Sequence, residues 1–282
     1  MTPDGAGTLY VVSTPIGNMG DFSFRAVDVL GAVDLVLAED TRHTGQLLKR
    51  YEIHAKLFAY HEHNESKATP GLVARMLAGA SMALVTDAGT PILSDPGARL
   101  VAAAIDAGVE VTPIPGASAL LAALVASGLS AERFTFFGFL PRTGGERRAA
   151  VAELTELDHT AVLYEAPGRV VQTFADLESA GAGDRRAAVA REMTKQFEEI
   201  RRGTVSELRA YYNESPPRGE VVIVLGGAPE RVVDEAEVRE RVRALRGQGL
   251  SARDTATMVA KELGVSRRLA YQLTQERDEK AD

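Results

Sequence analysis

The sequence predicts an α/β protein built from two α/β domains and a small C-terminal helical module. Apolar, strand-like runs alternate with amphipathic helical segments over residues 1–114. Strand-like runs continue over residues 115–228, where part of their spacing is typical of a hairpin, and none occurs in residues 232–282. Strands separated by helices indicate parallel βαβ units, in which ligands bind at the carboxyl ends of the strands.

The overall composition is that of a soluble globular protein. The 282 residues carry 32 Lys and Arg against 39 Asp and Glu, a formal net charge of −7, and 45% of them are hydrophobic. The absence of Cys excludes a disulfide framework, a thiol nucleophile and a cysteinyl zinc site. Pro and Gly interrupt the longest uncharged stretch, residues 111–131, so no membrane span is expected. The N-terminus lacks the pattern of an export signal, which predicts a cytoplasmic location.

The elements of the first domain follow from apolar runs that end in Gly- and Pro-rich loops. Strands are predicted at residues 9–12, 34–38, 83–86 and 109–112. Helices are predicted at residues 23–30, from Thr41 onward, and at residues 96–107 and 117–126. The second half repeats the strand pattern at residues 134–139, 161–164, 187–190 and 221–225. The spacing over residues 187–200 is that of a hairpin, so the second sheet is expected to be mixed.

The last fifty residues read as three helices after a Gly- and Pro-containing linker at residues 226–229. The helices are predicted at residues 234–246, 251–263 and 266–277, with Ser251 and Ser266 as N-caps. Residues 239–268 hold eight basic and three acidic side chains. The turn at residues 260–266 is similar to that of a helix-turn-helix. Two interpretations stay open, an RNA-binding module and a helical cap with solvated arginines.

Four loops of small, rigid residues follow the predicted strands of the first domain. They cover residues 14–18, 40–43, 86–97 and 113–118. Loops of this kind on one side of a sheet form a concave site where the backbone can approach a ligand closely. Neither a P-loop nor a G-x-G-x-x-G fingerprint is present. Backbone carbonyls, small side chains and Asp87 suit a flat, partly apolar, cationic ligand, which favours S-adenosylmethionine over a nucleoside triphosphate.

Several phrases of the sequence resemble the tetrapyrrole-methylase-fold family, and within it a branch that methylates ribosomal RNA. The phrases are LYVVSTPIGN at residues 9–18, AEDTR at 38–42, TDAGTP at 86–91, SDPG at 94–97, PGASA at 115–119, FGFLP at 137–141, YEAP at 164–167 and REMTK at 191–195. They recur in order over about residues 8–225. The porphyrinoid enzymes of the family have Gly-Pro-Gly-Asp in the first loop, where this chain has Pro15-Ile-Gly-Asn18, so a macrocycle substrate is disfavoured.

The resemblance implies a two-domain homodimer that binds S-adenosylmethionine in a crevice between its α/β domains. It implies 2′-O-methylation of a cytidine ribose in 16S rRNA at the decoding centre, within the small ribosomal subunit. Two other functions stay open: a porphyrinoid C-methyltransferase of the same fold, and a non-catalytic nucleic-acid-binding regulator. The intact loops at residues 87–91 and 115–119 argue against the regulator.

The same resemblance assigns the cofactor contacts, and the loop chemistry adds Asp87 and Pro115. The assigned residues are Pro15, Ala88, Gly89, Thr90, Leu93, Ser118, Ala119, Glu165 and Met193. A ribose hydroxyl needs an acceptor for its proton, so a nearby carboxylate is expected. We predict Asp40 as proton acceptor or orienting group, with Glu192 and Lys195 completing the catalytic set and Lys195 polarising the hydroxyl or a phosphate. An N-cap role for Asp40 is an equal alternative.

Ribosomal RNA requires cations, and we expect them on loops and exposed helix ends. The predicted RNA contacts are Arg42, His43, Arg142, Arg267 and Arg268. Phosphates bind such residues as a charge field, whereas bases need aromatic or polar pockets. No metal is expected, because His61 and His63 lack a third ligand at suitable spacing and fit a polar loop better.

Overall fold

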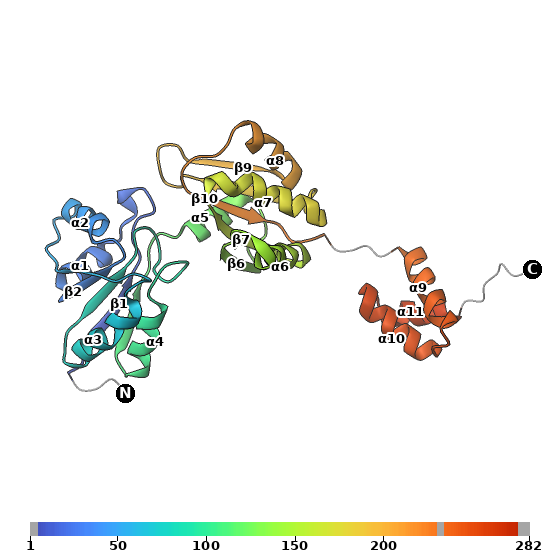
Figure 1. Ribbon diagram of the computed structural model, residues 1–282, viewed down its shortest axis with the longest axis horizontal. Coiled ribbons are helices and arrows are strands. Elements are labelled where there is room, and N and C mark those ends of the chain that lie inside the picture. Colours follow the sequence, from blue (N-terminus) through green and yellow to red (C-terminus); the bar gives the residue numbers. More distant parts are fainter. Residues whose placement is uncertain (1–4, 230–233, 276–282) are drawn as a thin grey trace, which may run out of the picture. The chain divides into compact units, whose positions relative to one another are not determined.

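The computed structural model describes residues 5–229 and 234–275 (Figure 1). Within these ranges the chain forms two five-stranded sheets and a separate group of three helices. Residues Met1–Ala228 make up one compact unit and Pro229–Asp282 a second. The predicted fold class, two α/β domains with C-terminal helices, is confirmed.

The first sheet is entirely parallel, as the alternation of strands and helices predicts. Its spatial order is β3 (Leu57–Ala59), β2 (Leu35–Ala38), β4 (Met82–Val85), β1 (Thr8–Val12) and β5 (Glu110–Ile114). The pairing registers include Leu9 with Met82 and Leu9 with Val111. Since all five strands run the same way, the loops after β1, β2, β4 and β5 emerge at one edge of the sheet.

Four helices cover both faces of this sheet (Figure 1). One face packs against α1 (Phe24–Ala32) and α2 (Thr41–Arg50), and the other against α3 (Glu65–Leu77) and α4 (Ala98–Asp106). The two layers bury separate apolar clusters, because alternate strand side chains point to opposite faces. Leu9 and Met82 belong to the cluster under α3 and α4, while Val12 and Ala83 belong to the one under α1 and α2.

The second sheet is mixed. Its order is β6 (Phe134–Phe139), β7 (Thr160–Glu165), β10 (Val221–Leu225), β8 (Arg186–Arg191) and β9 (Glu199–Thr204). The β8–β9 pair is antiparallel, which confirms the predicted hairpin, and β10 is antiparallel to both of its neighbours. All five residues of β10 are buried, and the strand has the bounds that the sequence predicts.

Helix α5 (Ala119–Ser127) lies on one face of the second sheet. The other face carries α6 (Gly144–Glu156), α7 (Val170–Leu177) and α8 (Val205–Glu214). Short helical turns complete the unit: the 3-10 turns η1 (Met19–Asp21) and η2 (Pro167–Arg169), and the π-helical turn η3 (Glu178–Ala182). Arg202 of β9 donates hydrogen bonds to the carbonyls of Ala126 and Ser127 and so closes the C-terminal end of α5.

The C-terminal unit consists of α9 (Glu235–Gly247), α10 (Ala252–Leu263) and α11 (Arg267–Gln275). Its own apolar core includes Val238, Val242, Val259 and Leu273. Ser251 caps α10, as predicted, and the hydroxyl of Ser266 accepts a hydrogen bond from the Leu269 amide at 3.1 Å. Residues 276 and 277 of the third predicted helix lie outside the described ranges.

Candidate functional site

Two loops of the first domain are bound to each other through their backbones. Thr14 follows β1, and Gly89 follows β4. Each donates its amide hydrogen to the other's carbonyl, at 2.8 Å from Thr14 and 3.1 Å from Gly89. The Thr14 hydroxyl also donates to the Thr86 carbonyl at 3.1 Å. The first and third Gly/Pro loops therefore form one rigid surface at the carboxyl edge of the sheet.

The fourth loop joins this surface through hydroxyl groups. The hydroxyls of Ser13 and Thr90 lie 3.1 Å apart, and the Thr90 hydroxyl donates to the Ala117 carbonyl at 3.3 Å. A Cβ on Gly116 would lie 2.9 Å from the Ser13 Cβ, so a residue with a side chain would not fit at this position without a shift of the loops. Three of the four predicted loops thus meet, with small side chains and backbone groups at their junction.

Gly89 satisfies a backbone requirement at the centre of this junction. Its φ is +89°, in the left-handed region that glycine adopts without steric cost. A Cβ on Gly89 would also lie 3.3 Å from Cγ2 of Ile16. The conformation and the close packing both explain why a glycine occupies this position.

The second sheet reaches the same loops. The Asn18 amide donates to the Thr194 hydroxyl at 3.0 Å, and a Cβ on Gly17 would lie 2.5 Å from Cγ of Lys195. The second sheet also approaches the loop after β4, because a Cβ on Gly138 in β6 would lie 2.8 Å from the Ser94 hydroxyl. We call the loops after β1, β2, β4 and β5 and residues 192–195 the interdomain loop cluster.

Left-handed backbone at non-glycine residues is concentrated in this cluster. Ile92 and Ser94 have φ values of +80° and +69°, and Glu192 and Thr194 have +50° and +66°. Such conformations cost free energy and persist only where the surroundings enforce them, which is frequent at functional sites. Their presence on both sides of the cluster makes it the candidate functional site of the unit.

Carboxylates that the sequence analysis did not single out form part of the cluster. Glu39, directly after β2, accepts a hydrogen bond from the Thr86 hydroxyl at 3.3 Å. Burial and the negative charges of Asp95 and Asp87 raise its pKa. Burial likewise raises the pKa of Asp95. Glu39 is therefore a stronger proton acceptor than an ordinary glutamate. The signal available in the sequence was its position at the end of a buried strand, beside Asp40.

Asp40 is the N-cap of α2. Its carboxylate accepts a hydrogen bond from the Arg42 amide at 2.8 Å and pairs with the Arg42 guanidinium at 2.6 Å. Hydrogen bonds from the Arg42 side chain and amide hold the pKa of Asp40 well below its usual range. A carboxylate of such low pKa is a poor proton acceptor. The N-cap alternative thus describes what Asp40 does in the structure, and its catalytic role stays a prediction.

Glu192 and Lys195 form an ion pair within the cluster. Lys195 Nζ lies 2.9 Å from Glu192 Oε1 and 3.0 Å from Glu220 Oε2. Burial acts to lower the pKa of Lys195, but the hydrogen bonds to both glutamates outweigh it and raise the pKa. The ammonium group is therefore charged at neutral pH. A charged ammonium group can polarise an oxygen atom, but it cannot accept a proton.

The predicted cofactor residues lie in different environments. Pro15 and Gly89 are buried, whereas Ala88, Leu93 and Pro115 are exposed on the loop surface. Met193 and Ala119 both pack against the apolar cluster between α5 and the second sheet. Asp87 accepts a hydrogen bond from the Asp40 amide at 3.3 Å, and Ser118 caps α5. The loop cluster therefore brings most of these residues together.

Glu165 lies in a different environment. Its side chain is 0% exposed and pairs with Arg169 at 3.0 Å. It also accepts hydrogen bonds from the Thr173 hydroxyl at 2.6 Å and the Ala166 amide at 2.9 Å. These partners occupy both carboxylate oxygens, so a ligand contact through this carboxylate would require them to move. The predicted cofactor contact stays a prediction.

The predicted RNA-binding side chains are all on the surface. Arg42, 88% exposed in its side chain, lies at the start of α2 beside the exposed His43. Arg142 lies on an exposed loop, and Arg267 and Arg268 are exposed at the start of α11. Tyr271, 46% exposed, comes one turn after them on that helix. Residues three and four apart share a helix face, so this face offers two cations and an aromatic ring.

Within the described ranges the chain shows neither a group of side chains that could hold a metal ion nor a membrane-spanning helix. No group of three or more His, Asp or Glu side chains there is placed to hold a metal ion. No helix in the same ranges has the length and apolar character needed to cross a membrane. The rings of His61 and His63 contact each other edge to face, with 5.9 Å between their centroids.

The four loops of the first domain lie in a part of the chain that matches a known protein family. Residues 8–209 match the family described as Tetrapyrrole (Corrin/Porphyrin) Methylases. The chain belongs to this family. The matched span contains both sheets except β10, and all four loops of the first domain.

Two relatives are similar to this protein over most of the chain. A protein of Synechocystis sp. named Ribosomal RNA small subunit methyltransferase I is 45% identical, over 96% of this chain and 98% of its own. A protein of Micromonospora olivasterospora with the same name is 44% identical, over 95% of this chain and 86% of its own. Both alignments therefore extend beyond the body of the methylase into the C-terminal helices.

A solved structure of the tetrapyrrole methylase fold agrees with the architecture. Uroporphyrin-III C-methyl transferase from Thermus thermophilus, complexed with S-adenyl homocysteine, matches with a TM-score of 0.56. The match covers 78% of this chain and 97% of the other, at 20% sequence identity. At this identity the likeness establishes the shared fold.

Proposed function

We propose that the protein is an S-adenosylmethionine-dependent methyltransferase that methylates the 2′-oxygen of a cytidine ribose in 16S rRNA, at the decoding centre. The relatives at 44 and 45% identity, both named as ribosomal RNA small subunit methyltransferases, give the main support. Membership in a methylase family and a fold neighbour complexed with S-adenyl homocysteine support the methyl donor. The proposal includes the small ribosomal subunit as substrate and a homodimer as the working form.

The interdomain loop cluster has the chemistry that S-adenosylmethionine requires. Gly89 and Gly116 leave no side chain at the junction, so the backbone itself can contact a flat ligand. The hydroxyls of Ser13 and Thr90 and the neighbouring carbonyls offer hydrogen bonds. The carboxylates of Glu39, Asp87 and Asp95 favour a cation. The bound cofactor supplies a methyl group on a positively charged sulfur.

The chain's own residues then have two tasks, positioning and proton removal. In-line attack forms a bond from the ribose oxygen to the methyl carbon as the carbon–sulfur bond breaks, so alignment carries much of the rate. The hydroxyl proton passes to a carboxylate, for which we propose Glu39, because its pKa is raised while that of Asp40 is lowered. The predicted alternative, Asp40, remains as an orienting group through its pair with Arg42.

Lys195 is proposed to hold the attacking hydroxyl or an adjacent phosphate. We expect Lys195→Ala to lower kcat by about tenfold to a hundredfold, since a charged hydrogen bond contributes about 1.5–3 kcal/mol. Affinity for S-adenosylhomocysteine should stay within a few-fold, because no cofactor contact is assigned to this side chain. Turnover on small ribosomal subunits and calorimetry measure the two effects. Wild-type turnover in the variant would remove Lys195 from the reaction.

The C-terminal unit is proposed to bind ribosomal RNA. Arg267, Arg268 and Tyr271 share a face of α11, where guanidinium groups can contact phosphates and the ring can stack on a base. Part of the positive charge is used internally, since Arg241 pairs with Glu262 at 2.6 Å and thereby joins α9 to α10. The alternative, a structural cap, predicts no effect of α11 on RNA.

Truncation after Pro229 tests the RNA-binding role. The methylase body should remain folded, because its last hydrogen bond, from the Ala228 amide to the Leu157 carbonyl, is retained and the removed helices have their own core. We expect unchanged S-adenosylhomocysteine affinity, weaker rRNA binding and a flatter salt dependence. Each lost phosphate contact should reduce the slope by about 0.7–0.9 log units of affinity per log unit of salt.

The Arg267→Gln/Arg268→Gln variant of the full chain is the matched test. It should reproduce part of the loss of RNA affinity seen in the truncated protein. The salt dependence should flatten by the contribution of about two phosphate contacts. Unaltered RNA affinity and salt slope in both proteins, measured by filter binding, would favour the cap.

Purified protein with small ribosomal subunits from cells that lack the enzyme tests the proposed function itself. We expect one methyl group per subunit, on a cytidine ribose of 16S rRNA. Transfer to a base, to free tetrapyrrole or to neither substrate would contradict the proposal. The porphyrinoid alternative is disfavoured by the names of the relatives, and the fold likeness to such enzymes is at only 20% identity.

A further inference from the structure

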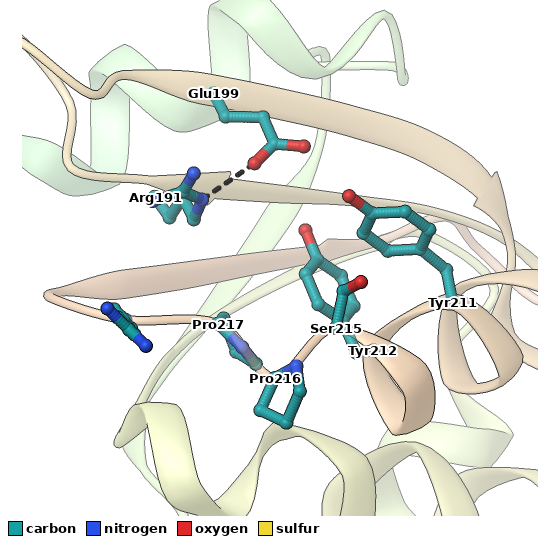
Figure 2. A pocket seen from close by; sticks show the side chains of 8 residues that line it. Arg191, Glu199, Tyr211, Tyr212, Ser215, Pro216 and Pro217 are labelled. Carbon is teal, nitrogen blue, oxygen red and sulfur yellow. Dashed lines mark hydrogen bonds and ion pairs between the residues drawn. The ribbon is translucent and has the colours of Figure 1, made fainter.

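A small pocket lies on the second domain, outside the interdomain loop cluster. Its volume is about 220 Å³, and it is lined by Arg191, Glu199, Tyr211, Tyr212 and residues 215–218. These come from β8, β9, α8 and the loop that leads to β10 (Figure 2). The pocket opens on the face of the sheet that carries α8, whereas Met193 and α5 lie on the other face. None of the roles assigned above uses it.

Tyr212 brings an unpaired hydroxyl to this pocket. The residue is 1% exposed, and among the described residues its hydroxyl has no hydrogen-bond partner. Figure 2 shows the hydroxyl ends of Tyr211 and Tyr212 directed toward the Arg191–Glu199 pair. A buried polar group without a partner costs free energy. The hydroxyl is therefore available to donate to a ligand.

The hydroxyl keeps its proton under physiological conditions. Burial, together with the negative charge of Glu199, raises the pKa of Tyr212 to about 12. The facing charges include Arg201 and Arg191, which act in the opposite direction without reversing the shift. A neutral hydroxyl that lacks a partner favours an acceptor, such as the oxygen of an anion.

The charges around the pocket also favour an anion. Arg191 Nε lies 2.7 Å from Glu199 Oε2, and Arg201 pairs with the other oxygen of the same carboxylate at 3.0 Å. The Arg201 guanidinium also lies 3.5 Å from the centre of the Tyr211 ring. Within the part of the chain that the structure describes, Arg218 has no hydrogen-bond or ion-pair partner. Arg191 and Arg218 line the pocket together with Glu199, and Arg201 pairs with the same glutamate beside it, so these four side chains carry a net charge of +2.

The loop that carries Arg218 is held in place from outside the pocket. The Glu220 amide donates to Glu192 Oε1 at 3.1 Å, and Lys195 pairs with both glutamates. Pro216 and Pro217 restrict the loop further, because proline fixes its own φ and restricts the residue before it. Arg218 is thus attached to a stiff loop, which lowers the entropy cost of binding.

We propose that this pocket binds a phosphate group, with the Tyr212 hydroxyl and the guanidinium groups of Arg191 and Arg218 as donors. Guanidinium groups match phosphate oxygens in geometry, and two excess positive charges suit a phosphate better than a single carboxylate. The volume falls below the range of roughly 300–1,000 Å³ that is typical of drug-sized ligands, which fits a small group. The phosphate could come from RNA or from a free nucleotide, and the RNA source rests on the function proposed above.

Titration of the full-length protein with cytidine 5′-monophosphate, in the presence of saturating S-adenosylhomocysteine, tests the proposal. We expect saturable binding, weakened at least about tenfold by Tyr212→Phe and by Arg218→Gln, since each removes a hydrogen bond to a charged group. Arg209→Gln is the matched control, because Arg209 lies on the same helix, pairs with Glu178 and does not line the pocket. It should bind as the wild type does. Acetate should bind at least about tenfold more weakly than the nucleotide.

The melting temperature separates a binding role of Tyr212 from a structural one. Removing a buried hydroxyl that has no partner should leave the melting temperature of Tyr212→Phe unchanged or raised. A lowered melting temperature with unchanged nucleotide affinity would overturn the proposal, as would the absence of saturable binding in the wild type.

The source of the phosphate is decided by competition with a single-stranded RNA oligonucleotide. Displacement of the nucleotide by RNA, lost in Tyr212→Phe, assigns the pocket to RNA. Nucleotide binding that RNA does not displace keeps the phosphate site and overturns RNA as its source. Methyl transfer to ribosomal subunits, measured on the same samples, reports separately on the proposed function.

Discussion

Gly89→Val is expected to weaken S-adenosylhomocysteine binding by more than about a hundredfold. A β-branched residue at a φ of +89° is strained, and its Cβ would meet Cγ2 of Ile16 at 3.3 Å. Relief of that strain has to move the backbone pair between Gly89 and Thr14, which fixes two of the loops. Isothermal titration calorimetry measures the loss.

Gly31→Val is the matched control for this variant. Gly31 lies in α1, and a Cβ there would have no heavy atom within 4 Å. The helix should keep or slightly gain stability, since valine has a higher helix propensity than glycine, while cofactor affinity stays as in the wild type. Unchanged affinity in Gly89→Val, with circular dichroism showing a folded protein, would locate the cofactor site elsewhere.

Glu39→Gln is expected to lower the rate of methyl transfer by about a hundredfold or more, as for the loss of a general base. Binding of S-adenosylhomocysteine should change little. The variant should fold, because a carboxyl whose pKa is raised on folding destabilises the native state when it is ionised, and glutamine removes that cost. Single-turnover rates on small ribosomal subunits measure the effect.

Asp40→Asn is the companion variant. Asparagine is as good an N-cap as aspartate, so α2 keeps its first turn while the charge is lost. We expect its single-turnover rate to fall much less than that of Glu39→Gln. The reverse order of the two rates would return the proton-acceptor role to Asp40.

The pH dependence of the wild type supplies an independent readout of Glu39. A base must be deprotonated, so the single-turnover rate should fall as the pH falls, with an apparent pKa above the value of about 4.3 for an ordinary glutamate. Asp87 and Asp95 raise the pKa of Glu39, whereas the Thr86 hydroxyl and His61 lower it, and the measured value belongs to this coupled group. A wild-type acidic limb that persists in Glu39→Gln would contradict the assignment.

Much of the fold could be predicted from the sequence, because its strands are short apolar runs with clear ends. Strand β10 and the β8–β9 hairpin are examples. Strand β3 and helix α3 escaped prediction for physical reasons. The strand has only three residues, none of them fully buried, and α3 contains a proline at position 70 that is typical of a helix end.

The sequence predicts which loops form the candidate site, but it does not predict which of the carboxylates there accept protons. Repeated Gly and Pro at strand ends identify the loops around Gly89 and Gly116. Whether a carboxylate accepts protons depends on neighbours that are distant in sequence, as with Glu39 beside Asp87 and Asp95. The capping role of Asp40 was one of two sequence-based alternatives, and the pair with Arg42 needed side-chain geometry. No sequence signal identifies the pocket beside Tyr212, because its lining residues come from three separate stretches of the chain.

Mass spectrometry of 16S rRNA nucleosides, from a strain that lacks this protein and from the same strain complemented with it, tests the central claim most directly. We predict that one 2′-O-methylcytidine at the decoding centre is missing in the deletion strain. The wild-type gene should restore it, whereas the Gly89→Val variant should not. An unchanged nucleoside profile in the deletion strain would contradict the proposed function.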